Sequence, residues 1–391
     1  MTGIWFWLGL VSGCIIEKGP RVALPSETYP VSRGTVSDPA LADKADAIVL
    51  AYLEQTQLPG LAVALVRDGQ PVLASGYGWA DLEAERLMTP TTPVLLSSVS
   101  KTFVGIAAMQ AVEAQRVTLE DAASDHLPFA LDNPKVDGET ITLRHLLTHN
   151  SGIEDSLAYH FSYDEGDPVV ALGEFCEGYL LKGGDFWRSG NFARRDPGTE
   201  FAYSNVGMAT AALALGTAAN LEFEDLVRRD IWEPLGMTQT AYLLEDLTDP
   251  PAVPYKTTGR QFRPYEAYGY PTYPDGLARS SAEDMARYAS MILGNGELDG
   301  EVVLSPDGVQ QLLEVDPAYG TDESGQAIAW AQREVNERLL YGHNGGDYGS
   351  FTELWLDTET GSGVVLLMHA RPDEFTEFLR VELRLLDLLD Q

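Results

Sequence analysis

The segment Ser98-Val99-Ser100-Lys101 places a serine hydroxyl three residues before a lysine amine. Residues three apart share one face of a helix, so the amine can reach the hydroxyl. A partly buried lysine has a lowered pKa and can accept the proton of the serine. An apolar helix pattern begins at Ser98, and the partial positive charge at a helix N-terminus stabilises negative charge there. The spacing is compatible with acyl transfer, with Ser98 as nucleophile. Taken alone, however, this motif favours a serine helix cap followed by a solvated lysine.

A second group of polar side chains follows Pro197-Gly198 and precedes another apolar helix pattern. Within it, Tyr203 beside a cationic lysine could lose its proton more readily and act as general base or proton shuttle. Asn205 offers a neutral amide that could hold either the lysine or a substrate carbonyl. Taken individually, Tyr203 is more consistent with a core or loop aromatic than with a catalytic residue.

A third group, Gly342-His343-Asn344-Gly345-Gly346, ends a predicted strand. Its glycines allow a backbone to approach a ligand closely. Backbone N–H groups there, together with that of Ser98, could form an oxyanion hole. By itself, His343 is also consistent with a polar residue at the end of a strand.

In this order the three groups resemble the serine β-lactamase and penicillin-binding-protein family, whose elements are Ser-x-x-Lys, Ser-Asp-Asn and Lys-Thr-Gly. The Tyr-x-Asn form is similar to the class C β-lactamase, D-aminopeptidase and esterase branch. The resemblance runs from about Leu58 to Met368 and includes Pro59-Gly60-Leu61, Leu143–Gly152, Pro234-Leu235-Gly236-Met237 and Gly276–Asp284.

The resemblance implies a role for each site residue. Ser98 would be acylated, Lys101 and Tyr203 would transfer protons, and Asn205 would orient the reacting groups. The N–H groups of Ser98 and Gly346 would then form the oxyanion hole. No cofactor and no metal is implied, and the expected partner is a small-molecule or peptide substrate, with the cell wall as one source.

The third group departs from the family pattern, because His343-Asn344-Gly345 stands where Lys-Thr-Gly is usual. Histidine is mostly neutral near pH 7 and attracts a substrate carboxylate less strongly than lysine does. This favours ester, amide or D-amino-acid peptide bonds over efficient β-lactam hydrolysis. A sensing module that is acylated once, or a non-catalytic scaffold, is the alternative, although the complete Ser, Lys, Tyr and Asn set argues against a scaffold.

The elements that must position these residues form two groups along the chain. Strand patterns lie near both ends, at Leu61–Val66, Pro71–Ser75, Ala327–Val335, Arg338–His343, Ser350–Asp357 and Val364–His369. Helix patterns lie at Ser98–Glu113, Leu143–His149, Val206–Ala219, Phe223–Leu235 and Glu374–Leu389. We expect one sheet built from both ends of the chain, with a helical insertion between them.

The fold class is therefore α+β. The resemblance specifies it further as a β-lactamase/transpeptidase-like antiparallel sheet flanked by helices. The expected catalytic domain covers residues 43–391, with a sheet lobe at about 43–97 and 286–391 and a helical lobe at about 98–285.

Composition and two other patterns limit the alternatives. The 59 acidic residues outnumber 26 Lys plus Arg, for a net charge of -33. Such a surface repels phosphate backbones, so nucleic acid is not an expected partner. His145 and His149 are four residues apart on a predicted helix but lack the His-Glu-x-x-His pattern, so we expect no metal there. No Gly-x-Ser-x-Gly occurs, which argues against an α/β-hydrolase.

The N-terminal residues resemble an export signal. Residues 4–11 form an apolar run of eight that is too short to span a bilayer, and Ser12-Gly13-Cys14 follows it. We expect a lipoprotein-type signal peptide at 1–14, lipidation of Cys14, and a tether at 15–42. The protein would then be periplasmic or on the cell surface, with membrane contact only through the lipid. A cytoplasmic protein with an apolar tail is the alternative.

Overall fold

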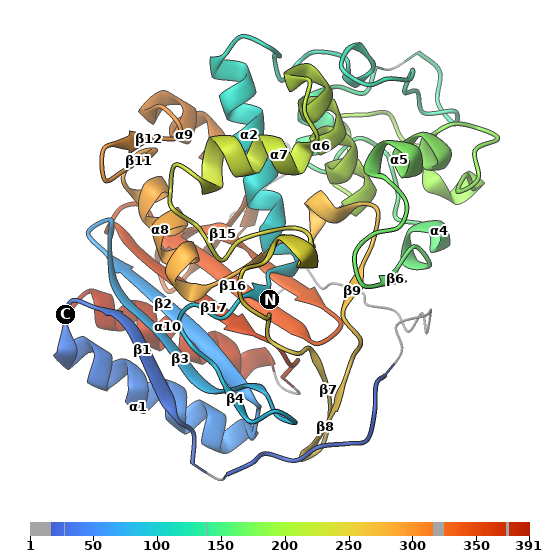
Figure 1. Cartoon of the computed structure of the whole chain (residues 1–391). Coiled ribbons are helices and arrows are strands. Elements are labelled where there is room, and N and C mark those ends of the chain that lie inside the picture. The colour runs from blue at the N-terminus through green and yellow to red at the C-terminus, as the bar shows by residue number, and fades with distance from the viewer. Residues whose placement is uncertain (1–16, 27, 139, 316–323, 373–374) are drawn as a thin grey trace.

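The computed structural model describes residues 17–26, 28–138, 140–315, 324–372 and 375–391 (Figure 1). The predicted signal peptide at 1–14 and its Cys14 lie outside these ranges. A sheet occupies the lower half of the view in Figure 1, and most of the helices lie above it. The fold is the predicted α+β arrangement, with strands from both chain ends in one sheet.

Within the described ranges, nine strands form the main sheet, in the order β1-β3-β2-β17-β16-β15-β14-β13 with β4 paired to β3. Every neighbouring pair is antiparallel. The central pairing is between β17 and β2, where Met368 lies opposite Leu61 and Gly363 opposite Val66. This pairing joins the two ends of the chain. The strands are β1 (Val31–Val36), β2 (Gly60–Arg67), β3 (Gln70–Asp81), β4 (Arg86–Leu87), β13 (Ser324–Gln326), β14 (Ala331–Val335), β15 (Arg338–Asp347), β16 (Ser350–Asp357) and β17 (Ser362–Met368).

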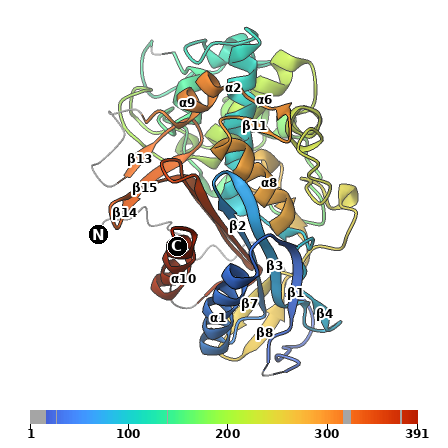
Figure 2. The same cartoon turned by 90° about the vertical axis from the view of Figure 1, so that its left-hand side faces the viewer.

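The two faces of the sheet are covered by different helices. α1 (Pro39–Thr56) and α10 (Phe375–Leu389) pack on one face, whereas α8 (Ala282–Leu293) packs on the other, as Figure 2 shows. Alternate residues of β2 accordingly enter two different cores. Leu61 and Val63 lie in the core beneath α1 and α10, and Ala62 and Ala64 lie in the core of the helical lobe. Burial on both faces explains why β2 reads as a continuous apolar run.

The helical lobe is built around α2 (Lys101–Glu113), which follows directly from the 3₁₀ turn η1 (Ser97–Ser100). α2 is apolar on nearly all sides, as is usual for a helix surrounded by others. It packs against α6 and α9. The other helices here are α3 (Leu143–Leu147), α4 (Leu157–His160), α5 (Leu172–Leu180), α6 (Asn205–Ala219), α7 (Phe223–Val227), the π turn η4 (Arg228–Trp232) and α9 (Pro306–Leu313).

Several short elements lie between the longer helices and strands along the chain. They are the strand pairs β5 (Val94–Leu95) with β10 (Arg279–Ser280), β6 (Asp164–Glu165) with β9 (Tyr268–Gly269), β7 (Tyr255–Thr258) with β8 (Gln261–Pro264), and β11 (Glu297–Leu298) with β12 (Glu301–Val302), together with the turns η2 (Ala123–Asp125), η3 (Ser189–Asn191), η5 (Leu244–Asp246) and η6 (Tyr273–Asp275). Among the described residues no single helix is both long and apolar enough to cross a membrane, and α6 with α7 and η4 passes by length and composition only as a pair bent by 73°.

The predicted boundaries need correction at three places. The tether predicted at 15–42 contains β1, which pairs with β3, and the start of α1, where the Asp38 carboxylate caps the helix. The helical-lobe boundary at residue 285 falls inside α8, which packs on the sheet. α9, assigned to the sheet lobe, packs instead on α2. Both errors at the lobe boundary arise because a helix in the connecting region can pack on either lobe, and a single sequence does not specify which.

A buried charge cluster joins α10 to the sheet. The guanidinium of Arg333 on β14 donates to the Glu382 carboxylate of α10 and lies 3.8 Å from the ring centre of Trp355 on β16. Trp355 Nε1 in turn donates to the Glu353 carboxylate. Burial raises the pKa of both glutamates, and the nearby Glu382 raises that of Glu353 further. One arginine thus serves two buried carboxyl groups.

Candidate active site

The turn that carries Ser98 is fixed to the sheet by hydroxyl groups of β16. Ser350 Oγ donates to the Leu95 carbonyl at 2.6 Å, and Thr352 Oγ1 donates to the Leu96 carbonyl at 2.6 Å. Ser97, which has a φ of 49°, donates to Ser350 Oγ at 3.0 Å. A left-handed conformation at a non-glycine residue is uncommon and costs energy, so the surrounding contacts must hold it. The backbone just before Ser98 is therefore rigidly placed.

The structure brings Ser98, Lys101 and Tyr203 together. Lys101 Nζ lies 3.1 Å from Ser98 Oγ, and Tyr203 Oη donates to the same oxygen at 2.9 Å. Lys101 Nζ is also 4.9 Å from the centre of the Tyr203 ring and donates to the Asp275 carbonyl at 2.6 Å. Ser98 is 9% exposed and Lys101 is fully buried. The geometry matches a nucleophile with two proton-handling neighbours.

Burial moves the pKa values of the two neighbours in opposite directions. It lowers the pKa of Lys101, although nearby carboxylates oppose this effect. It raises the pKa of Tyr203 well above its ordinary value, with only a partial offset from the hydrogen bond to Ser98. Tyr203 therefore keeps its proton, whereas Lys101 can become neutral much nearer to neutral pH. Of the two, Lys101 is better suited to accept the proton of Ser98.

Asp155, which sequence reasoning missed, organises the start of α6. Its carboxylate accepts hydrogen bonds from Asn205 N at 2.9 Å, Asn205 Nδ2 at 2.8 Å, Val206 N at 3.1 Å and Ser204 Oγ at 3.2 Å. Ser204 also caps the helix by accepting from Gly207 N. The Nδ2 group of Asn205 thus donates to Asp155. The carboxylate holds the segment that presents Tyr203, two residues before the helix begins.

His343 on β15 lies beside the trio as a neutral side chain. It is 3% exposed, and its ring centre is 6.1 Å from that of Tyr203. Burial, together with the charge of Lys101, lowers the pKa of His343 to about 3. The sequence-based expectation of a neutral residue at this position therefore agrees with the structure. No cationic charge is available from His343 to attract a substrate carboxylate.

Gly345 and Gly346 face opposite sides of β15. A Cβ atom on Gly345 would lie 2.3 Å from the Leu96 carbonyl oxygen, so only glycine allows the strand to approach η1 this closely. Gly346 is exposed, and a Cβ atom there would meet nothing nearer than 3.8 Å. Gly345 thus sets the distance between strand and turn, whereas Gly346 leaves its backbone open.

The register of the hairpin sets the direction of the Gly346 N–H. β15 and β16 are joined by two residues, and Asp347 pairs with Ser350 across the loop. The residue pair that closes a two-residue hairpin loop is hydrogen-bonded. Along an antiparallel ladder, hydrogen-bonded and non-hydrogen-bonded residue pairs alternate. Gly346, opposite Phe351, is thus in a non-hydrogen-bonded pair, and its N–H points away from β16. β14 no longer pairs with β15 beyond Gly342, so this edge is open and η1 packs beside it.

A group of tyrosines covers the end of β15. Tyr163 Oη donates to the Asp347 carboxylate at 3.3 Å, and its ring lies 4.6 Å from that of Tyr270 and 5.7 Å from those of Tyr268 and Tyr348. Burial raises the pKa of Asp347 to about 6. The sequence carries no signal for this tyrosine group, because residues 163, 268, 270 and 348 come together only in the folded chain.

The two histidines considered for a metal make separate contacts. His145 Nδ1 accepts from the Thr142 N–H at 3.2 Å as part of the α3 cap. His149 lies beyond α3 with a φ of 58°, accepts from the Ser204 N–H at 3.2 Å, and stacks on the Tyr203 ring at 4.2 Å. Within the described residues no three His, Cys, Asp or Glu side chains form a metal-ligand group.

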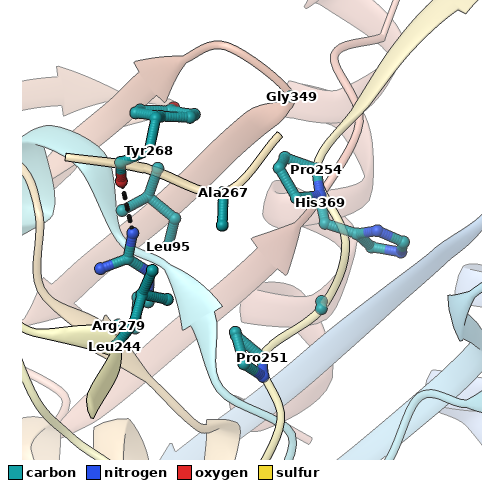
Figure 3. Close-up of a pocket in the computed structure, with 10 residues that line it drawn as sticks. Leu95, Leu244, Pro251, Pro254, Ala267, Tyr268, Arg279, Gly349 and His369 are labelled. Atoms are coloured by element: carbon teal, nitrogen blue, oxygen red, sulfur yellow. Dashed lines mark hydrogen bonds between the residues drawn. The ribbon is translucent and has the colours of Figure 1, made fainter. Parts of the chain in front are cut away.

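A small cavity lies beside Gly349 at the hairpin tip (Figure 3), and Ser98 is not among the residues that line it. It measures about 30 Å³ and is lined mainly by apolar side chains, with Arg279 at one side. Arg279 donates to the carbonyls of Tyr268 at 2.8 Å, Tyr242 at 2.9 Å and Leu277 at 3.3 Å. A space of this size holds one or two waters and no substrate. Arg279 therefore ties together segments behind the site.

Comparison with known proteins agrees with this geometry. The family model named Beta-lactamase matches residues 45–388. Protein flp of Staphylococcus aureus is 27% identical over 197 residues, which cover 50% of this chain and 37% of that protein. The putative penicillin-binding protein PbpX of Bacillus subtilis is 27% identical over 244 residues, which cover 62% of this chain and 56% of that protein. The matched stretch is thus less than two thirds of either relative.

Solved structures share the fold across most of the chain. EstCE1, described as a hydrolase with promiscuous acyltransferase activity, superimposes with a TM-score of 0.71 at 20% identity and covers 90% of this chain and 99% of its own. The D-alanine carboxypeptidase AmpC of Burkholderia cenocepacia gives 0.67 at 21% identity, with 89% and 99% covered. The octameric penicillin-binding protein homologue of Pyrococcus abyssi gives 0.68 at 22% identity, with 88% and 77% covered. With the site geometry and a family model matched over most of its length, the chain belongs to the Beta-lactamase family.

Proposed function

We propose that the protein is a serine hydrolase that acts through an acyl-enzyme at Ser98. The observation that carries this proposal is the position of Ser98 Oγ, 3.1 Å from Lys101 Nζ and 2.9 Å from Tyr203 Oη. The open N–H of Gly346 at the neighbouring strand edge supports it. Membership of the Beta-lactamase family gives further support.

The proposed reaction has two acyl transfers. Neutral Lys101 accepts the proton of Ser98 as Oγ attacks the substrate carbonyl, and the Ser98 and Gly346 N–H groups hold the oxyanion. The carbon–leaving-group bond then breaks, and the leaving group takes a proton delivered through Tyr203 and Lys101. A water molecule then attacks the acyl-enzyme, and its proton passes to neutral Lys101. As the bond between the acyl group and Ser98 Oγ breaks, Oγ takes back a proton, which releases the acid and free Ser98. Because Tyr203 is protonated at rest, it can donate its proton to the leaving group directly and then regain one from Lys101.

We propose ester, amide or D-amino-acid peptide bonds as substrates, with esters favoured over β-lactams. The charges around the site support this choice. His343 is neutral, and the carboxylates of Asp155, Asp275 and Asp347 surround Lys101. A substrate that carries its own carboxylate, as β-lactams do, meets several negative charges here, and His343 adds no positive charge to attract it. The descriptions of EstCE1 as a hydrolase and of AmpC as a D-alanine carboxypeptidase are compatible with both ester and peptide substrates.

The test is ester hydrolysis and acylation of the purified protein by p-nitrophenyl acetate, with a chromogenic β-lactam in parallel. Sustained release of p-nitrophenol is expected, together with a mass increase of one acetyl group on Ser98. Both should disappear in Ser98→Ala. Ser100→Ala is the matched control, since Ser100 Oγ is buried and accepts from the Ala278 N–H. It should retain acylation.

Three other results would change the interpretation. Release of one equivalent without turnover would favour the acylated sensing module. Full activity in Ser98→Ala would contradict the assignment of the nucleophile. Faster turnover of the β-lactam than of the ester would contradict the argument from the charges around the site.

A further inference from the structure

Asp275 is a buried acid that the reaction scheme above does not use. It ends η6, is 1% exposed, and its backbone carbonyl accepts from Lys101 Nζ at 2.6 Å. Its carboxylate atom Oδ2 is buried and has no hydrogen-bond partner among the residues that the structure describes. An unpaired polar atom in the interior is costly, so its retention beside the lysine calls for an explanation.

The carboxylates near Lys101 differ in how they are held. Asp155 accepts hydrogen bonds at the start of α6, and Asp347 accepts from Tyr163 Oη and the Tyr348 N–H. The charge of each is thus stabilised by donors from its own surroundings. Asp275 has the Thr272 side chain nearby, but the cation that stabilises its charge is Lys101. Its charge and that of Lys101 therefore depend on one another.

The remaining groups around this pair are neutral. Burial and the charge of Lys101 lower the pKa of His149 and of His343. Burial, with a smaller contribution from the charge of Asp275, raises the pKa values of five tyrosines; they are Tyr159, Tyr163, Tyr203, Tyr242 and Tyr270. These neutral side chains screen the pair little, so the interaction between its two charges is strong.

We propose that Asp275 is a positioning residue that holds Lys101 beside Ser98 through its carbonyl and sets the charge of Lys101 through its carboxylate. The inference rests on the proposed function, because it concerns the same base. Burial alone would make Lys101 lose its proton more readily than it does. Among the nearby carboxylates, the negative charge of Asp275 opposes this loss most, so it raises the pH at which Lys101 becomes a base.

The test compares Asp275→Asn and Asp275→Ala with the unchanged protein. Both variants keep the backbone carbonyl that binds Lys101 and remove the charge. The rate constant kcat/KM for p-nitrophenyl acetate is measured against pH. The midpoint of the rise with pH should move to lower pH by about one unit, the scale of one neighbouring buried charge. Asp275→Glu, which keeps the charge, should restore the midpoint toward that of the unchanged protein.

Asp284→Asn is the matched control. Asp284 is also buried, and its carboxylate accepts from Gln239 N and Thr240 Oγ1, but it is not among the groups that act on Lys101. This variant should lose stability and keep the midpoint. An equal shift in Asp284→Asn, or an unchanged midpoint in both uncharged variants of Asp275, would overturn the proposal.

A second measurement does not need turnover. The pKa of Lys101 is read by NMR from protein labelled with ¹³C at lysine Cε, with the signal assigned by its absence in Lys101→Met. A lower pKa in Asp275→Asn supports the proposal even if no ester is hydrolysed, in which case only the proposed function fails. An unchanged pKa overturns the role of Asp275, even if Ser98 proves to be the nucleophile.

Discussion

Replacing Gly345 by alanine should separate the catalytic turn from the sheet. The new Cβ would lie 2.3 Å from the Leu96 carbonyl oxygen, 2.4 Å from Thr352 Oγ1 and 3.0 Å from Ser97 Cβ, whereas ordinary contact begins at 3.4 Å. Thr352 cannot simply rotate away, since its hydroxyl donates to that same Leu96 carbonyl. Strand and turn must therefore move apart by about 1 Å, the difference between 3.4 and 2.3 Å.

Both stability and catalysis should respond. Forcing an extra methyl group into a packed contact costs about 1–3 kcal/mol of unfolding free energy. A displacement of about 1 Å between a nucleophile and its oxyanion donors reduces rates by roughly 10²-fold. Urea unfolding measures the first effect, and kcat/KM for p-nitrophenyl acetate measures the second. The KM should change less than kcat, because the substrate can still enter the site.

Gly346→Ala is the paired control one residue along the strand. Its Cβ would meet nothing nearer than 3.8 Å, and alanine keeps the N–H that the oxyanion requires. This variant should stay within a few-fold of the unchanged protein. Full activity in Gly345→Ala, or an equal loss in both variants, would refute the assignment of Gly345 as the spacer between β15 and η1.

Four further outcomes are expected. Because burial lowers the pKa of Lys101, kcat/KM should rise with pH to a plateau, and the midpoint of the rise should lie below the ordinary lysine pKa of about 10.4. A midpoint at the ordinary value would exclude Lys101 as the base. Asp155→Ala removes four hydrogen bonds at the start of α6 and should lower the unfolding free energy by about 2–4 kcal/mol in urea titrations, with a loss of activity because Tyr203 is displaced. The raised pKa of Glu353 means that the folded state holds its proton more tightly than the unfolded state, so stability declines as pH rises above the ordinary carboxyl range. In Glu353→Gln the melting temperature should therefore fall less between about pH 5 and pH 9 than in the unchanged protein. An identical fall would count against the role of the buried charge cluster. Cys14→Ala in the expressing bacterium should move the protein from the membrane fraction to the soluble fraction, and an unchanged distribution would argue against lipidation.

The main candidate site residues could be predicted because local spacing encodes them. Ser98 and Lys101 are three residues apart, and the glycines of the third group mark a close approach of the backbone. The central strands could be predicted for a similar reason, since burial on both faces gives β2 and β17 continuous apolar runs. Such features need no knowledge of distant segments.

Other residues acquire their roles only through distant contacts. Asp275 meets Lys101 across 174 positions, and Asp155 meets Asn205 across 50, so neither has a local pattern that could identify it. β1 was missed because this edge strand, Val31–Val36, mixes partly buried and exposed residues and carries no clear alternation. His149 was placed in a helix, but its backbone turns to the left-handed region where the chain leaves α3 to meet Tyr203.

The pairing of β17 with β2 has a consequence for synthesis of the chain. Residues 61–66 must wait for residues 363–368 before the centre of the sheet can form, so the emerging polypeptide passes Ser98 and most of the helical lobe long before β16 is available to fix η1. Contacts of such long sequence separation slow folding and leave apolar strands uncovered in the meantime. An unfinished chain should therefore contain Ser98, Lys101 and Tyr203 and yet be inert, so that hydrolytic activity begins only after translation of the last strand.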